Sequence, residues 1–109
     1  MSYVPERGDA IWIDFNPQAG HGQSGRRPAI VLSPQSYNGK VGLCLLCPVT
    51  SKVKGYPFEV VIPADSAVRG VVLSDQIKSM DWRVRNAELI EHLPEEVTIE
   101  VLKKLKSLL

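Results

Sequence analysis

Alternating apolar and polar residues open the sequence and predict a first β-strand over residues 8–15. In the segment GDAIWIDF, the two isoleucines and the phenylalanine fall on one side of an extended chain, and Trp12 and Asp14 fall on the other. The next segment, residues 16–26, reads NPQAGHGQSGR and has no apolar periodicity. Because Gly, Pro, Asn, Gln and Ser dominate it, we expect a surface loop after the first strand.

Further short apolar segments follow, each of strand length and each bounded by polar or turn residues. They are residues 27–33, 41–49, 58–62, 70–73 and 77–85, the last of them interrupted or bent around Met80-Asp81. Between the second and third predicted strands stands Tyr-Asn-Gly-Lys, residues 37–40, whose Asn-Gly pair predicts a tight hairpin. The pattern indicates a β-meander.

The sequence predicts one helix, over residues 94–109. Pro94 suits the first helical turn, two glutamates follow at the positively polarised start, and three lysines lie near the end. The apolar residues of one face are Val97, Val101, Leu105 and Leu108. Since a single terminal helix follows the strands and no helices alternate with them, we expect a mainly β fold. It would be a small antiparallel β-barrel in a single domain of residues 1–109.

Composition indicates an ordinary globular chain, with 44% hydrophobic and 23% charged residues. The longest apolar run falls short of the roughly 18 residues that a membrane helix needs, and the N-terminal residues lack the apolar core of a signal peptide. We therefore expect a cytoplasmic protein that does not enter a membrane. The formal net charge is only +1, so any affinity for nucleic acid must come from a local cluster of cations.

Two patterns look like ligand sites but are better explained otherwise. Cys44 and Cys47 form a C-x-x-C pair in a predicted strand, where residues three apart face opposite sides. Zinc would also need a second pair of ligands, and both histidines are distant in sequence. We predict core thiols, no metal and no cofactor. Residues 20–25 spell G-x-G-x-x-G, but a strand follows in place of the helix that a dinucleotide site requires.

Two adjacent arginines stand where the first loop meets the second strand. A guanidinium stays charged at physiological pH and binds two phosphate oxygens at once, so Arg26 or Arg27 could stabilise a phosphoryl transition state. The alternative is a surface arginine in a weak ion pair. At the end of the third strand, the hydroxyls of Thr50 and Ser51 precede Lys52 and could form the other wall of a phosphate pocket, or simply a polar turn.

Proton transfer and base stacking would require two further residue types. His21 has an ordinary pKa near neutrality, which suits proton transfer at a ribose oxygen, although a histidine between glycines is more often just exposed. Aromatic residues near loop ends can stack on unpaired bases, although most of them could equally belong to the core. Trp82 stands among cations in the segment KSMDWRVR, the pattern expected of a surface that binds RNA.

Four stretches of the sequence, in order, resemble the MazF/PemK family of toxins: GDAIWIDFNPQAG, GRRPAIVLSPQSYN, CPVTSKVKGYPFEV and VVLSDQIKSMDWR. They cover most of the first 85 residues, and residues 25–34 and 54–60 are the most specific. The resemblance implies an SH3-like (CcdB/PemK-type) barrel with a C-terminal helix that works as a homodimer. It also implies a metal-independent endoribonuclease toxin, which cuts single-stranded RNA, mostly mRNA, at specific sequences. In that reaction the ribose 2′-OH attacks, leaving a 2′,3′-cyclic phosphate and a 5′-OH.

By resemblance, the catalytic pair falls on Arg27 and on Thr50, the threonine after the proline of the third strand. Arg27 would assist proton transfer and neutralise the phosphorane, while Thr50 would donate a hydrogen bond to a non-bridging oxygen. Some members place a glutamate where this chain has Gly22, and residues 16–26 contain no carboxylate. We therefore hypothesise that His21 helps Arg27; a His21→Ala variant with an unchanged rate from about pH 6 to 8 would exclude this.

The remaining predicted RNA contacts combine cations, hydroxyls, amides and aromatic rings. They are Trp12, Gln23, Arg26, Ser51, Lys52, Lys54, Tyr56, Gln76, Lys78, Ser79, Trp82 and Arg83.

The resemblance also implies a partner, because members of this family are normally paired with a small acidic MazE-like antitoxin. A groove lined by cations attracts an acidic peptide as readily as RNA. The same barrel serves as a non-enzymatic gyrase poison in the CcdB branch, but such a poison is expected to lack the R-R-P and P-x-T-S motifs that are present here. A third possibility is an SH3-like module for proline-rich peptides. It would need acidic specificity loops, whereas these polar loops are mainly basic.

Overall fold

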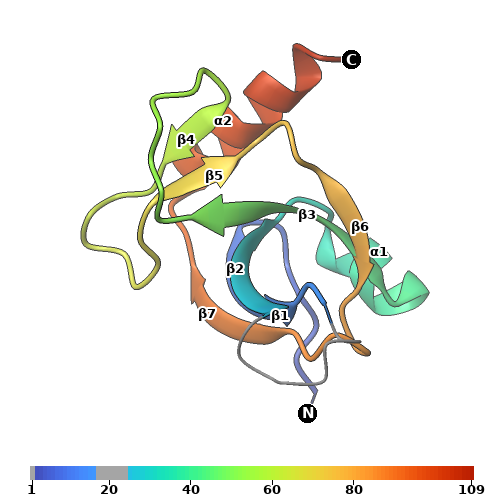
Figure 1. Cartoon of the computed structure of the whole chain (residues 1–109). Helices are drawn as coiled ribbons and strands as arrows, with labels where there is room; N and C mark the ends of the chain where they lie inside the picture. The colour runs from blue at the N-terminus through green and yellow to red at the C-terminus, as the bar shows by residue number, and fades with distance from the viewer. Residues whose placement is uncertain (1, 17–24) are drawn as a thin grey trace.

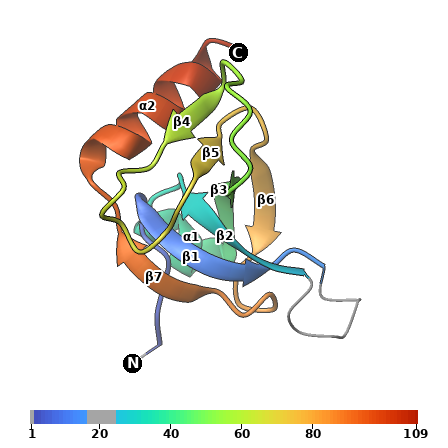
Figure 2. The same cartoon turned by 60° about the vertical axis from the view of Figure 1, so that its left-hand side comes forward.

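The computed structural model describes residues 2–16 and 25–109 as a strongly curved antiparallel sheet with two helices (Figures 1 and 2). The strands are β1 (Asp9–Asp14), β2 (Arg26–Val31), β3 (Leu43–Thr50), β4 (Glu59–Val61), β5 (Val71–Leu73), β6 (Lys78–Asp81) and β7 (Glu88–His92). The helices are α1 (Gln35–Val41) and α2 (Glu95–Lys106). In the part of the chain described, neither helix has the length and apolar character needed to cross a membrane.

The sheet confirms the predicted mainly β fold with a C-terminal helix. Its strands follow the order β4-β5-β3-β2-β1-β7, and β6 pairs with β3 off this path. β3 is the centre of the molecule, because its start pairs with β6, its end pairs with β5, and β2 lies along its other edge. Among the described residues the two outer strands, β4 and β7, do not pair with each other, so the barrel is open on one side.

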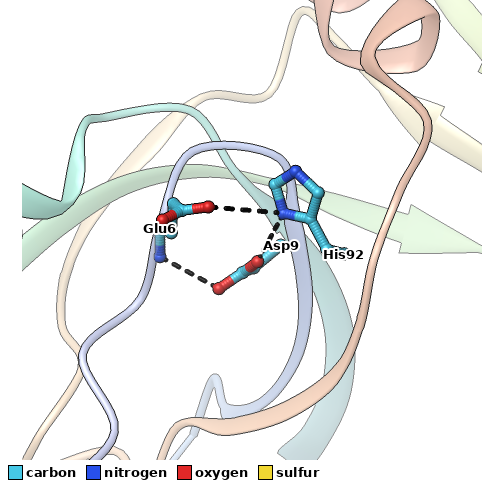
Figure 3. A group of neighbouring side chains, drawn as sticks. All are labelled: Glu6, Asp9 and His92. Atoms are coloured by element: carbon cyan, nitrogen blue, oxygen red, sulfur yellow. Dashed lines mark hydrogen bonds and ion pairs between the residues drawn. The ribbon is translucent and has the colours of Figure 1, made fainter.

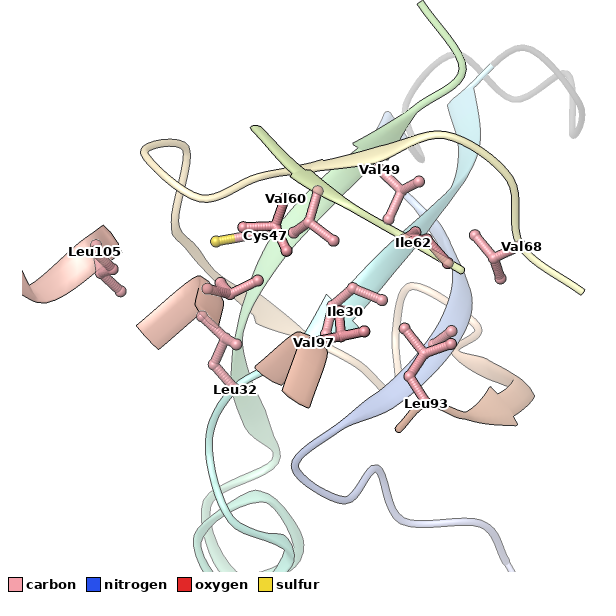
Figure 4. Close-up of a cluster of buried hydrophobic side chains, with 13 residues drawn as sticks. Ile30, Leu32, Cys47, Val49, Val60, Ile62, Val68, Leu93, Val97 and Leu105 are labelled. Atoms are coloured by element: carbon pink, nitrogen blue, oxygen red, sulfur yellow. The ribbon is translucent and has the colours of Figure 1, made fainter. Parts of the chain in front are cut away.

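The central strands are buried on both faces, which explains the apolar runs in their sequences. One core cluster lies between the sheet and α2 (Figure 4) and contains Ala10, Ile30, Leu32, Cys47, Val49, Val60, Ile62, Val68, Val72, Leu93, Val97, Val101 and Leu105. The other lies toward α1 and β6 and contains Ile11, Ile13, Ala29, Val31, Cys44, Leu46, Met80 and Trp82. The predicted apolar face of α2 is correct except for Leu108, which is exposed.

The predicted hairpin at Asn38-Gly39 is wrong, because this segment forms helix α1. Asn38 is fully buried, and its amide donates to the backbone oxygens of Pro5 and Ser33 at 2.8 and 3.0 Å. Its amide oxygen accepts a hydrogen bond from the Ser33 hydroxyl at 2.6 Å. The helix ends at Gly42, whose φ of 82° suits glycine at a helix C-terminus. The asparagine therefore acts as a buried link between segments and not as a turn residue.

Strand β7 was not predicted from the sequence. It pairs antiparallel with β1, and the register shifts between Ala10 and Ile11. Most of its residues are charged or partly exposed, so it carries no clear apolar alternation. β7 nevertheless completes one wall of the site described below.

Candidate functional site

Arg27 and Thr50 lie at neighbouring strand ends and line one cleft. The β2–β3 ladder ends where Ala29 pairs with Pro48, and continuing its register by two residues in each direction brings Arg27 to the position facing Thr50. Opposite residues of an antiparallel pair project from the same face of a sheet. The arginine is exposed and the threonine half-buried, and both side chains are therefore accessible to a ligand in the cleft.

The cleft between these strand ends has a volume of about 530 Å³. Its lining residues come from β1, β2, the end of β3, the turn before β5, and β7. They are Trp12, Arg27, Pro28, Val49, Thr50, Ser51, Lys52, Ala67, Val68, Arg69 and Ile90. Three of these described residues are cations and none is a carboxylate, so the cleft suits a polyanion.

Two smaller hollows adjoin the cleft through shared residues. One, of about 310 Å³, shares Thr50 and Lys52 with the cleft and adds the predicted contacts Lys54, Tyr56 and Gln76. The other, of about 200 Å³, shares Arg27 and adds Lys78 beside Gln76. The structure thus brings seven of the predicted RNA-site residues around Arg27 and Thr50: Trp12, Ser51, Lys52, Lys54, Tyr56, Gln76 and Lys78.

Arg26 does not point its guanidinium at a ligand, because carboxylates and a carbonyl of the chain occupy it. One of its terminal nitrogens donates to Asp14 Oδ1 and to the Asn86 carbonyl, both at 3.0 Å, and the other donates to Glu88 Oε1 at 2.9 Å. Hydrogen bonds from Asn86 and Arg26 hold the pKa of Asp14 below its ordinary value. Arg26 is therefore not the RNA contact that we predicted. Together with Asp14, Asn86 and Glu88 it forms a clamp that joins β1, β2 and β7.

Trp82 is also a correction, since it is a core residue. Its ring is only 5% exposed, and its indole N–H donates to the Asn38 carbonyl at 2.9 Å. Arg83 stacks over that ring at 4.7 Å from its centroid and donates to the Gly39 carbonyl. Among the described residues, Trp82, Arg83 and Ser79 line neither the cleft nor the two hollows beside it. The polar neighbours of Trp82 in sequence concealed its buried position.

The loop that carries Lys54 and Tyr56 is fixed by carboxylates from within the chain. The backbone N–H groups of Lys54 and Gly55 each donate to the Glu59 carboxylate at 3.1 Å. The Tyr56 hydroxyl donates to Asp75 Oδ2 at 2.6 Å, and this hydrogen bond raises the pKa of the phenol. Asp75 was not predicted from the sequence, yet it orients an aromatic ring that is 45% exposed beside Lys52.

His21 and Gln23, together with Gly22, lie outside the described residues, so their predicted roles stay predictions. Arg69 is a cation that the sequence prediction missed. It stands in the turn before β5, where no apolar period or motif marks it, and only the following glycine signals a constrained turn.

The two cysteines are core thiols, as predicted. Both are buried in opposite core clusters, and burial raises the pKa of each thiol to about 12. Because they face different clusters, they cannot bind one ion together.

A separate group, Glu6, Asp9 and His92, brings three possible metal ligands within 4.8 Å of one another (Figure 3). Contacts within the chain already engage Asp9, whose carboxylate accepts hydrogen bonds from the Tyr3 hydroxyl at 2.6 Å and the Glu6 backbone N–H at 3.0 Å. The other oxygen lies 2.8 Å from His92 Nδ1. We interpret the group as a link between the N-terminal segment and β7.

Comparison with known proteins gives a consistent result. Residues 6–109 match the family described as PemK-like, MazF-like toxin of type II toxin–antitoxin system. The chain is 55% identical over 85 residues to the endoribonuclease toxin MazF of Escherichia coli, covering 78% of this chain and 76% of the relative. It is 37% identical over 107 residues to the endoribonuclease toxin ChpB of Escherichia coli, covering 94% and 91%.

Solved structures agree with this relationship. MazF from Deinococcus radiodurans is 57% identical and superposes with a TM-score of 0.89, covering 98% of this chain and 97% of that one. A MazE-MazF complex from Deinococcus radiodurans gives a TM-score of 0.88 at 51% identity, covering 98% and 96%.

Proposed function

The chain belongs to the PemK-like, MazF-like toxin family and is an endoribonuclease toxin, and we propose that Arg27 and Thr50 form its catalytic site. The observation that carries this proposal is their shared cleft, which opens where β2 begins and β3 ends. We further propose that the substrate is single-stranded mRNA, cut at a specific sequence without a metal ion. The protein would then act in the cytoplasm, where its substrate is, as one domain.

The proposed reaction starts with attack of a ribose 2′-oxygen on the adjacent phosphorus. The P–O5′ bond breaks, the 2′-hydroxyl loses its proton, and the leaving 5′-oxygen gains one, so the products are a 2′,3′-cyclic phosphate and a 5′-hydroxyl. The guanidinium of Arg27 neutralises the additional negative charge of the phosphorane and assists proton transfer. The hydroxyl of Thr50 donates a hydrogen bond to a non-bridging oxygen. We propose His21 as a partner in proton transfer.

Substrate binding combines stacking with charge. Trp12 is 41% exposed in the cleft and Tyr56 is 45% exposed in the adjoining hollow, so each ring offers a face to an unpaired base. Lys52 lines both the cleft and this hollow, Lys54 lines the hollow, and both cations suit backbone phosphates. Gln76 and Lys78 extend this surface toward Arg27. We expect the side-chain amide of Gln76 and the loop residues to select the base, since cations that bind phosphates do not distinguish bases.

We propose an acidic MazE-like antitoxin as the inhibitory partner. A solved structure of a similar MazF contains MazE, and the cationic cleft of this chain suits an acidic segment that competes with RNA. The same family relationship disfavours a CcdB-like gyrase poison.

We also propose a homodimer formed through an apolar groove of about 540 Å³. Tyr37, Leu45 and Ile77 line it beside the end of α2, and each is 38–39% exposed. Exposed apolar surface of this kind favours burial against a second copy. Leu45→Glu should give monomers in light scattering, whereas Leu89→Glu, at a residue 47% exposed on β7, should leave the dimer intact. A dimeric Leu45→Glu variant would contradict this interface.

The catalytic assignment can be tested with a long RNA in EDTA. The wild-type protein should give discrete fragments with 2′,3′-cyclic phosphate and 5′-hydroxyl ends. Thr50→Val removes one hydroxyl while keeping the side-chain shape, so it should lower kcat by about 100-fold without unfolding the protein. Thr50→Ser should restore most of the rate. A Thr50→Val variant with normal kcat would remove Thr50 from the mechanism.

A further inference from the structure

Arg69 is a cation of the cleft that the family motifs do not mark. It stands in the turn between β4 and β5 and lines the same cleft as Arg27, Thr50 and Lys52. Its side chain is exposed, and within residues 2–16 and 25–109 it makes no hydrogen bond or ion pair with the protein. This contrasts with Arg26, whose guanidinium donates three hydrogen bonds to groups of the chain.

The turn that carries Arg69 is held firmly. The preceding residue, Val68, is 4% exposed and belongs to the core cluster beneath α2. The backbone N–H of Ala67 donates to Glu91 Oε2 at 3.2 Å, and the backbone N–H of Ile62 donates to the Gly70 carbonyl at 3.1 Å. The backbone of Arg69 is therefore anchored on both sides while its side chain is free to meet a ligand.

Gly70 places this turn directly against the catalytic strand end. Its φ of 114° belongs to the region that favours glycine, and a Cβ atom there would collide with the carbonyl oxygen of Thr50. No other residue type allows so close an approach of the two backbones. The backbone of Arg69 is consequently held beside Thr50 by main-chain packing, and its side chain extends from a fixed point at the edge of the cleft.

We propose that Arg69 binds the RNA phosphate next to the one that is cut, and so forms a second phosphate subsite. The inference rests on the proposed function, since it takes the phosphate at Arg27 and Thr50 as the reacting one. Two adjacent phosphates of one RNA strand are best bound by two neighbouring cations. Arg27 and Arg69 line the same cleft, and no carboxylate is among its described lining residues. Arg69 is thus a binding residue, separate from the bond-breaking pair.

The test uses a single-stranded oligonucleotide that contains the cut sequence with a 2′-deoxy sugar at the cleavage position, so that it binds without reacting. Arg69→Ala should weaken its binding by about tenfold and lower the slope of log K against log salt by about 0.7. Lys103→Ala, which removes one exposed charge from α2, should change neither quantity. Arg69→Lys should recover part of the affinity.

Neutral methylphosphonates identify which phosphate is bound. In the wild type, substitution of one phosphate next to the cleavage position should weaken binding, and Arg69→Ala should be insensitive to that substitution alone. Binding by Arg69→Ala equal to that by Lys103→Ala would overturn the proposal. The proposal would also be overturned if Arg69→Ala binding still weakened with a methylphosphonate at every position that matters for the wild type. Arg69 would then contact a base or nothing. Normal cleavage by Arg27→Ala would instead contradict the proposed catalytic site.

Discussion

Arg26 and Arg27 are adjacent in the sequence and chemically identical, but the fold places their side chains in opposite surroundings. Arg26 is fixed by Asp14, Asn86 and Glu88, and its side chain is only 24% exposed. Arg27 projects from the next position of β2 into a cleft whose described lining has no carboxylate. The comparison shows that a guanidinium stays open to a ligand when the chain places no carboxylate beside it, and links strands when the chain supplies two.

The largest effect expected from this contrast is the loss of cleavage in Arg27→Ala. Removing the charge that neutralises the phosphorane should lower kcat/KM by about 1,000-fold, while the free energy of unfolding stays unchanged because the side chain is exposed. Rate measurements on a defined transcript and urea denaturation report the two quantities. A variant that cleaved normally would mean that the available arginine is not the catalytic one.

Arg26→Ala should show the reverse pattern. The loss of its charged hydrogen bonds should lower the free energy of unfolding by about 1–2 kcal/mol. Below the melting temperature, cleavage should fall by less than about tenfold, because Arg26 does not touch the substrate in the proposed site. Arg26→Lys serves as the matched control, since it keeps the charge but cannot reach all three partners. A 1,000-fold loss in folded Arg26→Ala would reverse the two assignments.

A smaller effect should appear in the pH dependence of stability when Asp14 is changed. The pKa of Asp14 is lowered in the folded protein by hydrogen bonds from Asn86 and Arg26. Its contribution is therefore present above the ordinary carboxyl pKa of about 4 and is lost as pH falls through the lower folded value. Asp14→Asn should cost less than about 1 kcal/mol at neutral pH. The difference from wild type should shrink toward about pH 2 in urea titrations.

A difference that stayed constant with pH would show that Asp14 acts through its shape and not its charge. Glu91→Gln is a suitable control for this measurement, because Glu91 lies on the same strand as Glu88 but outside the clamp.

The sequence correctly predicted those strands and the helix whose apolar residues follow one regular spacing. The strands at residues 27–33 and 58–62 and the helix from Pro94 follow from apolar spacing, and the structure has β2, β4 and α2 there. The pairing of Arg27 with Thr50 came from a family motif, and the β2–β3 register gives it a physical basis. Neither arginine's role follows from local sequence, because β1 and β7 supply the partners of Arg26 from 12 and 62 residues away.

The errors have the same origin. Asn38 suggested a turn, yet its three hydrogen bonds to buried groups stabilise a short helix instead. Trp82 suggested a surface ring because its sequence neighbours are polar, while its contacts are with α1 and the core. Arg69 gave no signal at all, since its place in the cleft depends on how closely the Gly70 turn meets Thr50. Each of these features is decided by contacts distant in sequence.

The pairing of β1 with β7 also bears on when the toxin becomes dangerous to the cell that makes it. β1 leaves the ribosome well before β7, its second strand partner, which begins at Glu88, and the clamp on Arg26 needs Asn86 and Glu88. A nascent chain therefore cannot complete the wall of its cleft until residues 86–92 have been synthesised. We expect stalled chains that end before residue 86 to leave their own message uncut, which ribosome-bound cleavage assays would reveal.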